Sequence, residues 1–544
     1  MAFNIADLFE HAVDCFPDRL AVACGDDEVT YAELEERANR LAHHLGAHGV
    51  GAGSHVAMCT RNRLQSFVTM LAVYKLRAAL INVNYRYTAN EIRYVLDNAD
   101  VVALVHERTY ADRVAEALPG APTVKHVVVI EDETDLAFTG VAYQEALASG
   151  SPERDFDERS NDDHYLLYTG GTTGQPKGVI WRHEDVWRAL GGGINFLTGE
   201  PLLTEYDQAE VGKVTGGLTR LCLAPLIHGN AQWAGLMALF GGDAVVLLTQ
   251  FDPVDVWTTI ERRKVNVVVL IGDAMARPMI EAYRAGTYDV SSVYAISSSA
   301  ALFSQSVKNQ YLESLPNVVI TDAIGSSETG FMGMGMITKD SEQGIGGPRV
   351  SAGTDTIVID EAGVPLPAGS EQIGRLARGG HIPLGYYKDP EKTERLFVQV
   401  EGRRYTVPGD FARHEPDGTI TLLGRGNTCV NTGGEKVFPE EVESALMSHP
   451  DVFDVLVVGV PDDRLGQQVA AIVEPRPGAT PSFDELSAHV RKEIAGYKVP
   501  KSIWLVDKVH RLATGKADYR WANSYATDHP EDVLCAPHSA TSSA

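Results

Sequence analysis

The sequence predicts an α/β protein with a large N-terminal domain of mostly parallel sheets and helices, followed by a small, mobile α+β C-terminal domain. Two observations carry this prediction. Through about residue 420, apolar runs of strand length alternate with segments of helical periodicity. Such runs, bounded by Gly, Pro or Asp, are typical of strands covered on both faces. Beyond residue 425, short strands and helices fill about 100 residues, a common domain size.

The first clear element of the N-terminal domain is a helix. Thr30 and Glu33 form a capping-box pattern, in which the threonine hydroxyl accepts from a backbone N–H and the glutamate reaches back. The apolar residues that follow recur at three- and four-residue spacing, as a helix requires: Leu34, Ala38, Leu41, Ala42 and Leu45. Strands are predicted next at residues 101–105, 127–130, 221–226, 244–248, 265–271 and 318–320.

The C-terminal domain begins with two predicted short strands in residues 429–438, on either side of a turn at Gly433 and Gly434. Pro439 suits the first position of a helix. A strand at 455–460, a helix at 483–495 and a strand at 503–506 are predicted after it. We therefore expect an N-terminal domain at 1–425, a hinge at 426–428, a C-terminal domain at 429–528 and a disordered, polar tail at 529–544.

Composition excludes several classes of protein. With 44% hydrophobic and 22% charged residues, the chain resembles a soluble globular enzyme and not a disordered protein. Its net charge of −26 argues against a nucleic-acid partner, so any bound polyanion must be held by local donors. The six cysteines are scattered without disulfide or metal-ligand spacing, which favours the reducing cytoplasm. We expect no secretory signal and no transmembrane segment, because the required apolar runs are missing.

The strongest local signal is YTGGTTGQPKG at residues 168–178. Glycines let a backbone approach a phosphate, while exposed N–H groups, hydroxyls and a lysine can bind its oxygens. A flexible surface turn would be the ordinary interpretation of an anonymous Gly/Thr stretch. A P-loop kinase or NTPase is excluded by pattern, because two residues separate Gly174 from Lys177 and Gly178 replaces the Mg²⁺-binding hydroxyl.

This segment resembles the phosphate loop of the adenylate-forming superfamily, which includes acyl-CoA synthetases, peptide-synthetase adenylation domains and luciferases. Further family-like motifs follow in order over nearly the whole chain: residues 30–42, PLIH at 225–228, GSSETG at 325–330, YTVPGD at 405–410, Gly424-Arg425 and TGK at 514–516. Residues 179–186, 297–301 and 429–439 are similar to actinobacterial CoA ligases for fatty acids and for steroid side-chain or ring-fragment acids. The chain is identified as a member on several independent motifs.

The resemblance implies two half-reactions. A carboxylate attacks the α-phosphate of ATP to give an acyl-adenylate and pyrophosphate, and the thiol of coenzyme A then displaces AMP. Because the carboxylate and the triphosphate are both anionic, the main catalytic demand is charge neutralisation with in-line positioning.

Roles for individual residues also come from the resemblance. Glu328 would hold Mg²⁺, a cation that prefers oxygen ligands, and Ser327 would face the α-phosphate. His228 would lie beside the acyl carboxylate, and Asp410 would accept from the ribose hydroxyls with Arg425 nearby. The remaining nucleotide-binding positions are the phosphate loop, the adenine segment and one motif glycine: Thr169, Gly170, Gly171, Thr172, Thr173, Gly174 and Lys177; Ser299, Ala300, Ala301 and Asp322; and Gly325.

Lys516 carries the sharpest expectation. In the family the equivalent lysine touches the carboxylate and the α-phosphate only during adenylation. The C-terminal domain then rotates about the hinge and opens a tunnel for the pantetheine arm of CoA, past small residues such as Gly433 and Gly434. Outside this context, a Gly-Lys pair near a C-terminus would be interpreted as a solvated loop.

Four positions depart from the family pattern. Gly170 stands where many relatives have serine, and Ile324 where an aromatic often stacks on adenine. Asn427 replaces the usual hinge Asp or Lys, and Asn431 replaces a lysine of many fatty-acyl and aryl members. These departures put the nucleotide packing, the hinge and one CoA contact in question.

The choice of acid is expected to depend on residues between His228 and about Met336, which are rich in Gly, Met and aromatics. This composition fits either a roomy apolar acyl site or ordinary core packing. The leading hypothesis is an AMP-forming acid–CoA ligase for a fatty or steroid-derived acid, with aryl acids as another class. An adenylating enzyme with another acceptor, such as a carrier protein, and a non-catalytic nucleotide-binding protein are the alternatives. Oligomeric state is not readable, and a homodimer is left open.

Overall fold

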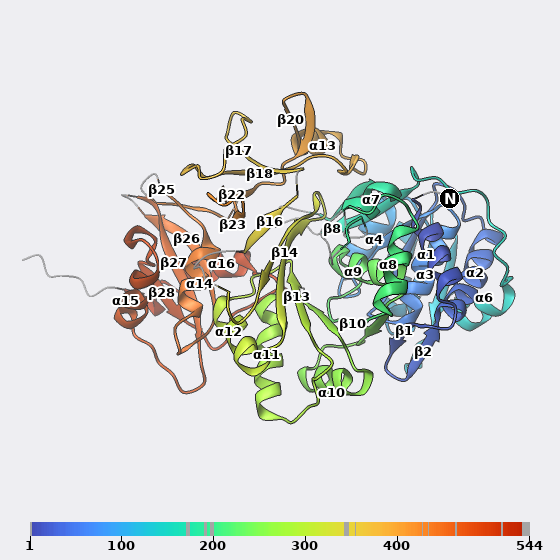
Figure 1. Cartoon of the computed structure of the whole chain (residues 1–544), viewed down its shortest axis with the longest axis horizontal. Coiled ribbons are helices and arrows are strands. Elements are labelled where there is room, and N and C mark those ends of the chain that lie inside the picture. The colour runs from blue at the N-terminus through green and yellow to red at the C-terminus, as the bar shows by residue number, and fades with distance from the viewer. Residues whose placement is uncertain are drawn as a thin grey trace, which may run out of the picture.

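The computed structural model describes residues 3–169, 175–189, 193–195, 201–341, 348–353, 355–426, 428–432, 435–462, 465–512 and 515–535. Figure 1 shows the N-terminal helices at one end of the molecule, the large sheet in the middle and the C-terminal domain at the other end. In the described parts of the chain, no helix combines the length and the apolar composition needed to cross a membrane.

The N-terminal end contains a parallel sheet of order β4-β3-β5-β6-β7. Its strands are β3 (His55–Cys59), β4 (Ala79–Asn82), β5 (Val101–Glu107), β6 (His126–Ile130) and β7 (Val141–Ala142). The helices around it are α1 (Ile5–Cys15), α2 (Tyr31–Ala47), α3 (Leu64–Lys75), α4 (Ala89–Asn98), α5 (Ala111–Ala117) and α6 (Tyr143–Ser149). The predicted capping box is confirmed: the Thr30 hydroxyl accepts from Glu33 N, and the Glu33 carboxylate from Thr30 N.

The large sheet begins with the order β2-β1-β11-β10-β12-β13-β14, and its pairs from β1 to β14 are parallel. The strands are β1 (Leu20–Cys24), β2 (Asp27–Thr30), β10 (Thr219–Cys222), β11 (Ala244–Leu247), β12 (Val267–Leu270), β13 (Ala295–Ser299) and β14 (Val319–Ser326). Its helices are α7 (His183–Ala189), α8 (Asp207–Thr215), α9 (Gly229–Phe240), α10 (Pro253–Arg263), α11 (Gly272–Ala285) and α12 (Gln305–Ser314). β10 ends at Cys222, before the predicted residue 226, and beyond it the Asn62 side chain bonds to the Ala224 carbonyl and to Leu226 N.

Both faces of this parallel region are covered, as the continuous apolar runs predicted. Along β12, Val268 packs in the cluster that contains α10, α11 and α12. Its neighbours Val267 and Val269 belong to the opposite cluster, which contains α1, α2, α3 and α9. The α/β fold class is therefore confirmed, with a separate core on each side of the sheet.

Beyond β14 the same sheet continues in antiparallel pairs through β15-β16-β23-β22-β18, and β21 and β20 form its far edge. The strands are β15 (Gly330–Ile337), β16 (Arg349–Ala352), β17 (Thr356–Ile359), β18 (Gly374–Arg378), β20 (Phe397–Val400), β21 (Arg403–Thr406), β22 (Asp410–His414) and β23 (Ile420–Arg425), with helix α13 (Pro390–Leu396) nearby. A smaller antiparallel sheet has the order β19 (Gly385–Tyr386), β9 (Lys177–Arg182), β8 (His164–Thr169).

The C-terminal domain has its own sheet, of order β25-β24-β27-β28-β29, and β26 also pairs with β27. Its elements are β24 (Val430–Thr432), β25 (Glu435–Val437), α14 (Pro439–Met447), β26 (Val452–Asp462), β27 (Gly466–Pro475), α15 (Phe483–Glu493), β28 (Ser502–Leu505), α16 (Tyr519–Asp528) and β29 (Leu534–Cys535). The chain leaves the large sheet at the end of β23 and enters this sheet at β24.

One part of the predicted tail is wrong. Residues 529–535 are ordered, because β29 pairs with β28 and the His529 carbonyl accepts from Trp504 Nε1 at 2.7 Å. The buried indole needs a partner for its N–H, and the tail provides one. Residues 536–544 lie outside the described residues.

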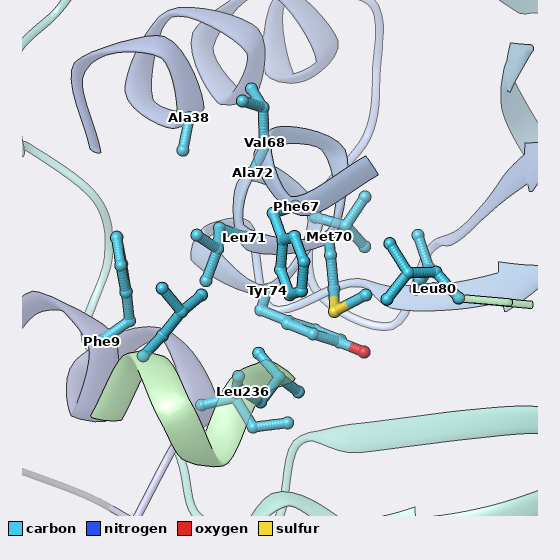
Figure 2. Close-up of a cluster of buried hydrophobic side chains, with 14 of the residues drawn as sticks. Phe9, Ala38, Phe67, Val68, Met70, Leu71, Ala72, Tyr74, Leu80 and Leu236 are labelled. Carbon is cyan, nitrogen blue, oxygen red and sulfur yellow. The ribbon is translucent and has the colours of Figure 1, made fainter. Parts of the chain in front are cut away.

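Helix α3 forms the centre of the N-terminal core, which Figure 2 shows in close-up. Its side chains are buried on nearly every side, as expected for a helix that is apolar all round. Phe67 of α3 faces α9 at Gly235, where an added Cβ would lie 2.4 Å from the Phe67 ring. The glycine therefore permits the close approach of these two helices.

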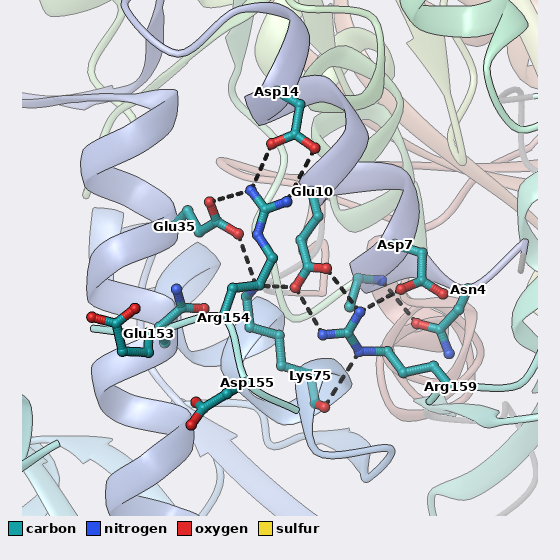
Figure 3. Close-up of polar contacts among 12 residues, drawn as sticks. Asn4, Asp7, Glu10, Asp14, Glu35, Lys75, Glu153, Arg154, Asp155 and Arg159 are labelled. Atoms are coloured by element: carbon teal, nitrogen blue, oxygen red, sulfur yellow. Dashed lines mark hydrogen bonds and ion pairs between the residues drawn. The ribbon is translucent and has the colours of Figure 1, made fainter. Parts of the chain in front are cut away.

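A buried charge cluster anchors the C-terminal end of α3 (Figure 3). The fully buried Lys75 ammonium contacts Glu10 of α1 and lies 3.2 Å from Glu35 of α2. Arg159 also binds Glu10 at 2.8 Å, and Arg154 binds Glu35 at 2.7 Å. Burial alone would raise the pKa of Glu10, but Lys75 and Arg159 hold it below its ordinary value. The cluster ties α1, α2 and α3 together with ionised side chains.

Candidate active site

The predicted phosphate loop connects β8 to β9. Thr169 pairs with Lys177 at the end of this hairpin next to the loop, and residues 170–174, which include Gly170, Gly171, Thr172, Thr173 and Gly174, lie outside the described residues. Lys177 Nζ lies 2.9 Å from Asp389 Oδ2, and this bond raises the pKa of the lysine. Asp389 also caps α13 through Lys392 N. The structure thus holds the loop lysine as a cation, through an aspartate that the sequence analysis did not identify.

The hairpin between β14 and β15 presents Ser327 and Glu328. Thr329 Oγ1 accepts from Ser326 N at 2.9 Å, and Ser326 Oγ accepts from Glu328 N at 3.2 Å. At Gly325 an added Cβ would lie 2.2 Å from the Gly330 carbonyl oxygen, so the tight crossing requires glycine. Local hydrogen bonds therefore fix the turn on which both residues lie.

Two aromatic residues connect this turn to the smaller sheet. Trp181 Nε1 of β9 donates to the Ser327 carbonyl at 3.0 Å, and the Tyr386 hydroxyl of β19 donates to Glu328 Oε1 at 2.8 Å. The predicted phosphate-binding and metal-binding segments therefore lie side by side. Neither contact could be predicted from the sequence, since Trp181 and Tyr386 lie far along the chain from the residues that they bind.

The predicted adenine segment follows β13. The parallel register places Ser298 beside Asp322 and Ser299 beside Ala323. Ala300 has a φ of +68°, and Ala301 N donates to the Ser299 carbonyl at 2.9 Å, so the chain turns sharply at the end of the strand.

Two polar groups of this region are buried. The Asp322 carboxylate pairs with Lys308, and burial raises its pKa. The Ser299 hydroxyl has no hydrogen-bond partner among the described residues. Asp322 thus lies at the predicted place with a lysine partner that the sequence analysis did not foresee, and its role toward adenine stays a prediction.

Asp410 and Arg425 are directly opposite one another on the antiparallel strands β22 and β23. Gly409, with a φ of +99°, precedes the aspartate, and its carbonyl accepts from Gly426 N at 3.0 Å. The Arg425 side chain and Asn427 lie outside the described parts of the chain. The register thus brings together the two residues expected at the ribose.

His228 is the N-cap residue of α9 and is partly buried, and its Nε2 has no hydrogen-bond partner among the described residues. Burial lowers the pKa of His228 to about 3, and the positive charges of Lys516 and Arg86 contribute to the shift. The imidazole is therefore neutral at pH 7. The charge of Lys516, in the C-terminal domain, thus acts on this residue of the N-terminal domain.

A short hairpin carries Lys516. Leu512 N donates to the Lys516 carbonyl at 2.9 Å, and Arg511 pairs with Ala517 across the turn. Gly515 has a φ of +78°, and an added Cβ would lie 2.9 Å from Ala274 Cβ in α11. The hairpin therefore packs directly against the N-terminal domain at a point where only glycine fits.

Other contacts join the two domains around this hairpin. Arg277 of α11 contacts Met447 Sδ at 3.6 Å and lies over the ring of Phe453. Arg476 pairs with Glu281 at 3.3 Å. Most of these contacts are polar or semi-exposed, as in interfaces that open and close. Gly433 and Gly434, expected along the CoA path, lie outside the described residues.

The glycines of the predicted acyl segment are explained by packing. An added Cβ at Gly229 would lie 2.8 Å from the Trp233 ring. At Gly333 and Gly335 it would lie 2.7 and 2.3 Å from carbonyl oxygens of β16. For these three positions the structure favours close packing of strand and helix over room for a ligand.

Comparison with known proteins gives consistent matches. The family model described as AMP-binding enzyme matches residues 9–387, and the model described as AMP-binding enzyme C-terminal domain matches residues 441–516. The chain is 54% identical to a 3-oxocholest-4-en-26-oate–CoA ligase of Rhodococcus rhodochrous, over 98% of both chains. It is equally similar to a medium/long-chain-fatty-acid–CoA/3-oxocholest-4-en-26-oate–CoA ligase of Mycobacterium tuberculosis, over 99% of both. Among solved structures, ATP-bound MatB from Rhodopseudomonas palustris matches with a TM-score of 0.81 and 25% identity, over 97% of this chain and 99% of that one.

Proposed function

The chain belongs to the AMP-binding enzyme family and is an AMP-forming acyl-CoA ligase, and we propose that its acid is apolar, either a fatty acid or the side-chain acid of a steroid. Support comes from full-length relatives at 54% identity whose names state these two kinds of acid. Their similarity extends over 98–99% of this chain, and so across both domains.

One observation carries the mechanism that we propose. The hairpin that carries Lys516 in the second domain packs against α11 of the first domain, where an added Cβ at Gly515 would lie 2.9 Å from Ala274 Cβ, and the charge of Lys516 contributes to the lowered pKa of His228. A lysine held beside this partly buried, neutral imidazole would supply positive charge where an acyl carboxylate and an α-phosphate meet. We therefore assign this docked arrangement to the adenylation step.

The remaining residues are assigned by their positions. Lys177 and the loop after Thr169 would hold the β- and γ-phosphates, and Asp410 with Arg425 would hold the ribose. Glu328 would hold Mg²⁺, since its carboxylate is oriented by Tyr386 and such oxygens suit this cation. When bound, Mg²⁺ neutralises phosphate charge. Ser327, Ser299, Ala300, Ala301 and Gly325 would line the nucleotide.

We further propose that residues 429–528 rotate about residues 426–428 after adenylation, which withdraws Lys516 and admits CoA past Gly433 and Gly434. The change of sheet between β23 and β24 supports a boundary at this point. A cytoplasmic location is supported by the cysteines that the structure describes as free: Cys15, Cys24, Cys59, Cys222 and Cys429.

Separate assays of the two half-reactions test the proposed role of Lys516. In Lys516→Ala, pyrophosphate release should fall by about two to three orders of magnitude, the loss seen when a transition-state donor is removed. Thioester formation from supplied acyl-adenylate should be largely retained. Lys492→Ala, at an exposed lysine of α15, serves as the control and should keep both rates. Equal loss of both steps in Lys516→Ala would contradict the two-conformation account.

A substrate panel tests the proposed acid. AMP release with and without CoA is measured for octanoate, palmitate, 3-oxocholest-4-en-26-oate and benzoate. We expect CoA-dependent turnover with the fatty or steroid acids and little with benzoate. Turnover confined to benzoate would refute the proposed acid class. AMP release unaffected by CoA would instead point to another acyl acceptor.

A further inference from the structure

Three histidines gather in the N-terminal domain, at the end of the molecule opposite the C-terminal domain (Figure 1). His44 lies in the last turn of α2, His48 caps that helix, and His126 is the first residue of β6. One potential ligand atom from each lies within 4.8 Å of the other two. The Lys516 site does not use any of them.

The hydrogen bonds around the cluster fix where two of the rings carry their protons. Ser149 Oγ donates its hydrogen to the Ala146 carbonyl at 2.9 Å, so it accepts from His44 Nδ1 at 2.8 Å. His48 Nδ1 donates to the His44 carbonyl at 2.7 Å. In both neutral rings Nε2 therefore keeps its lone pair. A second polar partner on the other nitrogen is the usual arrangement for a histidine that binds a metal.

The third ring, His126, is in direct contact with His44. His126 Nε2 lies 2.8 Å from His44 Nε2, so without a metal His126 donates the hydrogen between them. Tetrahedral Zn²⁺ with bonds of about 2.0–2.1 Å separates two imidazole nitrogens by roughly 3.3 Å. An ion could therefore replace that hydrogen after a separation of about half an ångström, with His126 then protonated on Nδ1.

We propose that His44, His48 and His126 bind one late first-row divalent cation, of which Zn²⁺ is the representative. Three imidazoles without a carboxylate suit Zn²⁺, Co²⁺, Ni²⁺ or Cu²⁺ and not Mg²⁺ or Ca²⁺. The partial negative charge at the C-terminus of α2 favours a cation at the same place.

Binding requires one rearrangement. The exposed His48 ring stacks on His126, with centroids 3.9 Å apart and an interplanar angle of 16°. Because a metal lies in the plane of each ring that binds it, His48 turns out of this stack. The bound ion then joins α2 to β6, and through Ser149 to the end of α6.

Metal titration of the full chain, with any histidine tag removed and bound metal stripped by a chelator, tests this site. Co²⁺ is added and its visible absorption recorded, and Zn²⁺ is then added to displace it. We expect one ion per chain, displaced by Zn²⁺ but not by millimolar Mg²⁺. Both His44→Gln and His126→Gln should abolish binding, while His489→Gln, on α15 beside His449, should leave it unchanged.

Two milder variants decide the result if the buried substitutions do not fold. His48→Gln changes an exposed side chain and should weaken Co²⁺ binding at least about tenfold, and Ser149→Ala should weaken it by about the same factor. Far-UV circular dichroism confirms that each variant is folded. Failure to bind one ion per chain, displacement by Mg²⁺, or unchanged affinity in folded His48→Gln and Ser149→Ala would overturn the proposal.

Discussion

Replacement of Gly515 by alanine tests whether the Lys516 hairpin must dock on the N-terminal domain. An added Cβ at this position would lie 2.9 Å from Ala274 Cβ. Ala274 lies in the first turn of α11, and its methyl side chain has no rotamer that would move it away. Relief of such an overlap costs typically about 1–3 kcal/mol. This cost applies only when the two domains are in contact.

The docked arrangement should therefore become about 5- to 150-fold less populated in Gly515→Ala. Adenylation, measured as pyrophosphate release without CoA, should fall by the same factor. Thioester formation from supplied acyl-adenylate should be preserved, because the proposed rotation withdraws the hairpin in that step. The effect on the two rates thus differs in a way that general destabilisation would not produce.

Gly478 provides the matched control. It lies in the same domain with a φ of +82°, but an added Cβ there meets nothing within 4 Å. Gly478→Ala therefore introduces the same left-handed backbone strain, about 1–2 kcal/mol, without the contact. It should leave both half-reactions unchanged. Equal slowing of both steps in Gly515→Ala, or an unchanged adenylation rate, would refute the reasoning.

Three further predictions concern the charge cluster, a buried histidine and the metal position. Lys75→Met should reduce the free energy of unfolding by about 3–5 kcal/mol, because it leaves buried carboxylates without their cation. Arg395→Ala is the control, because Arg395 pairs with Glu391 on the surface, where the two side chains are 82% and 85% exposed. It should lower the free energy of unfolding by at most about 1 kcal/mol, and urea titration measures both variants. Burial lowers the pKa of His183 to about 4. Between pH 6.5 and 4 the unfolded chain therefore binds a proton that the folded chain does not. As the pH is lowered through this range, the free energy of unfolding should fall by up to about 1.4 kcal/mol per pH unit because of this group. His183→Asn should make this dependence on pH less steep. Tyr386→Phe removes the hydrogen bond to Glu328, which contributes about 1 kcal/mol. The Mg²⁺ concentration required for half-maximal adenylation should therefore rise roughly fivefold.

Each of these has a result that would contradict it. Equal urea midpoints for Lys75→Met and the wild type would mean that the cluster adds nothing to stability. An acid slope unchanged in His183→Asn would place the titrating group elsewhere. If Tyr386→Phe lowered the rate at every Mg²⁺ concentration by one factor, Tyr386 would act on something other than the metal.

Elements that depend on neighbouring residues could be predicted from the sequence. The capping box at Thr30 and Glu33 forms as expected, and the strands near residues 101–105 and 127–130 appear as β5 and β6. The antiparallel continuation beyond β14 was not foreseen in detail, because pairing partners are chosen by the whole fold and not by local preference.

The sequence by itself determined the family, the order of the motifs and the residue types available for each chemical task. Only the tertiary structure decided their partners: Asp389 for Lys177, Tyr386 for Glu328, and a position for Lys516 that affects His228. The physical reason is that these contacts join segments far apart in the chain. Their strength depends on distance, burial and dielectric environment, which no local pattern of residues specifies.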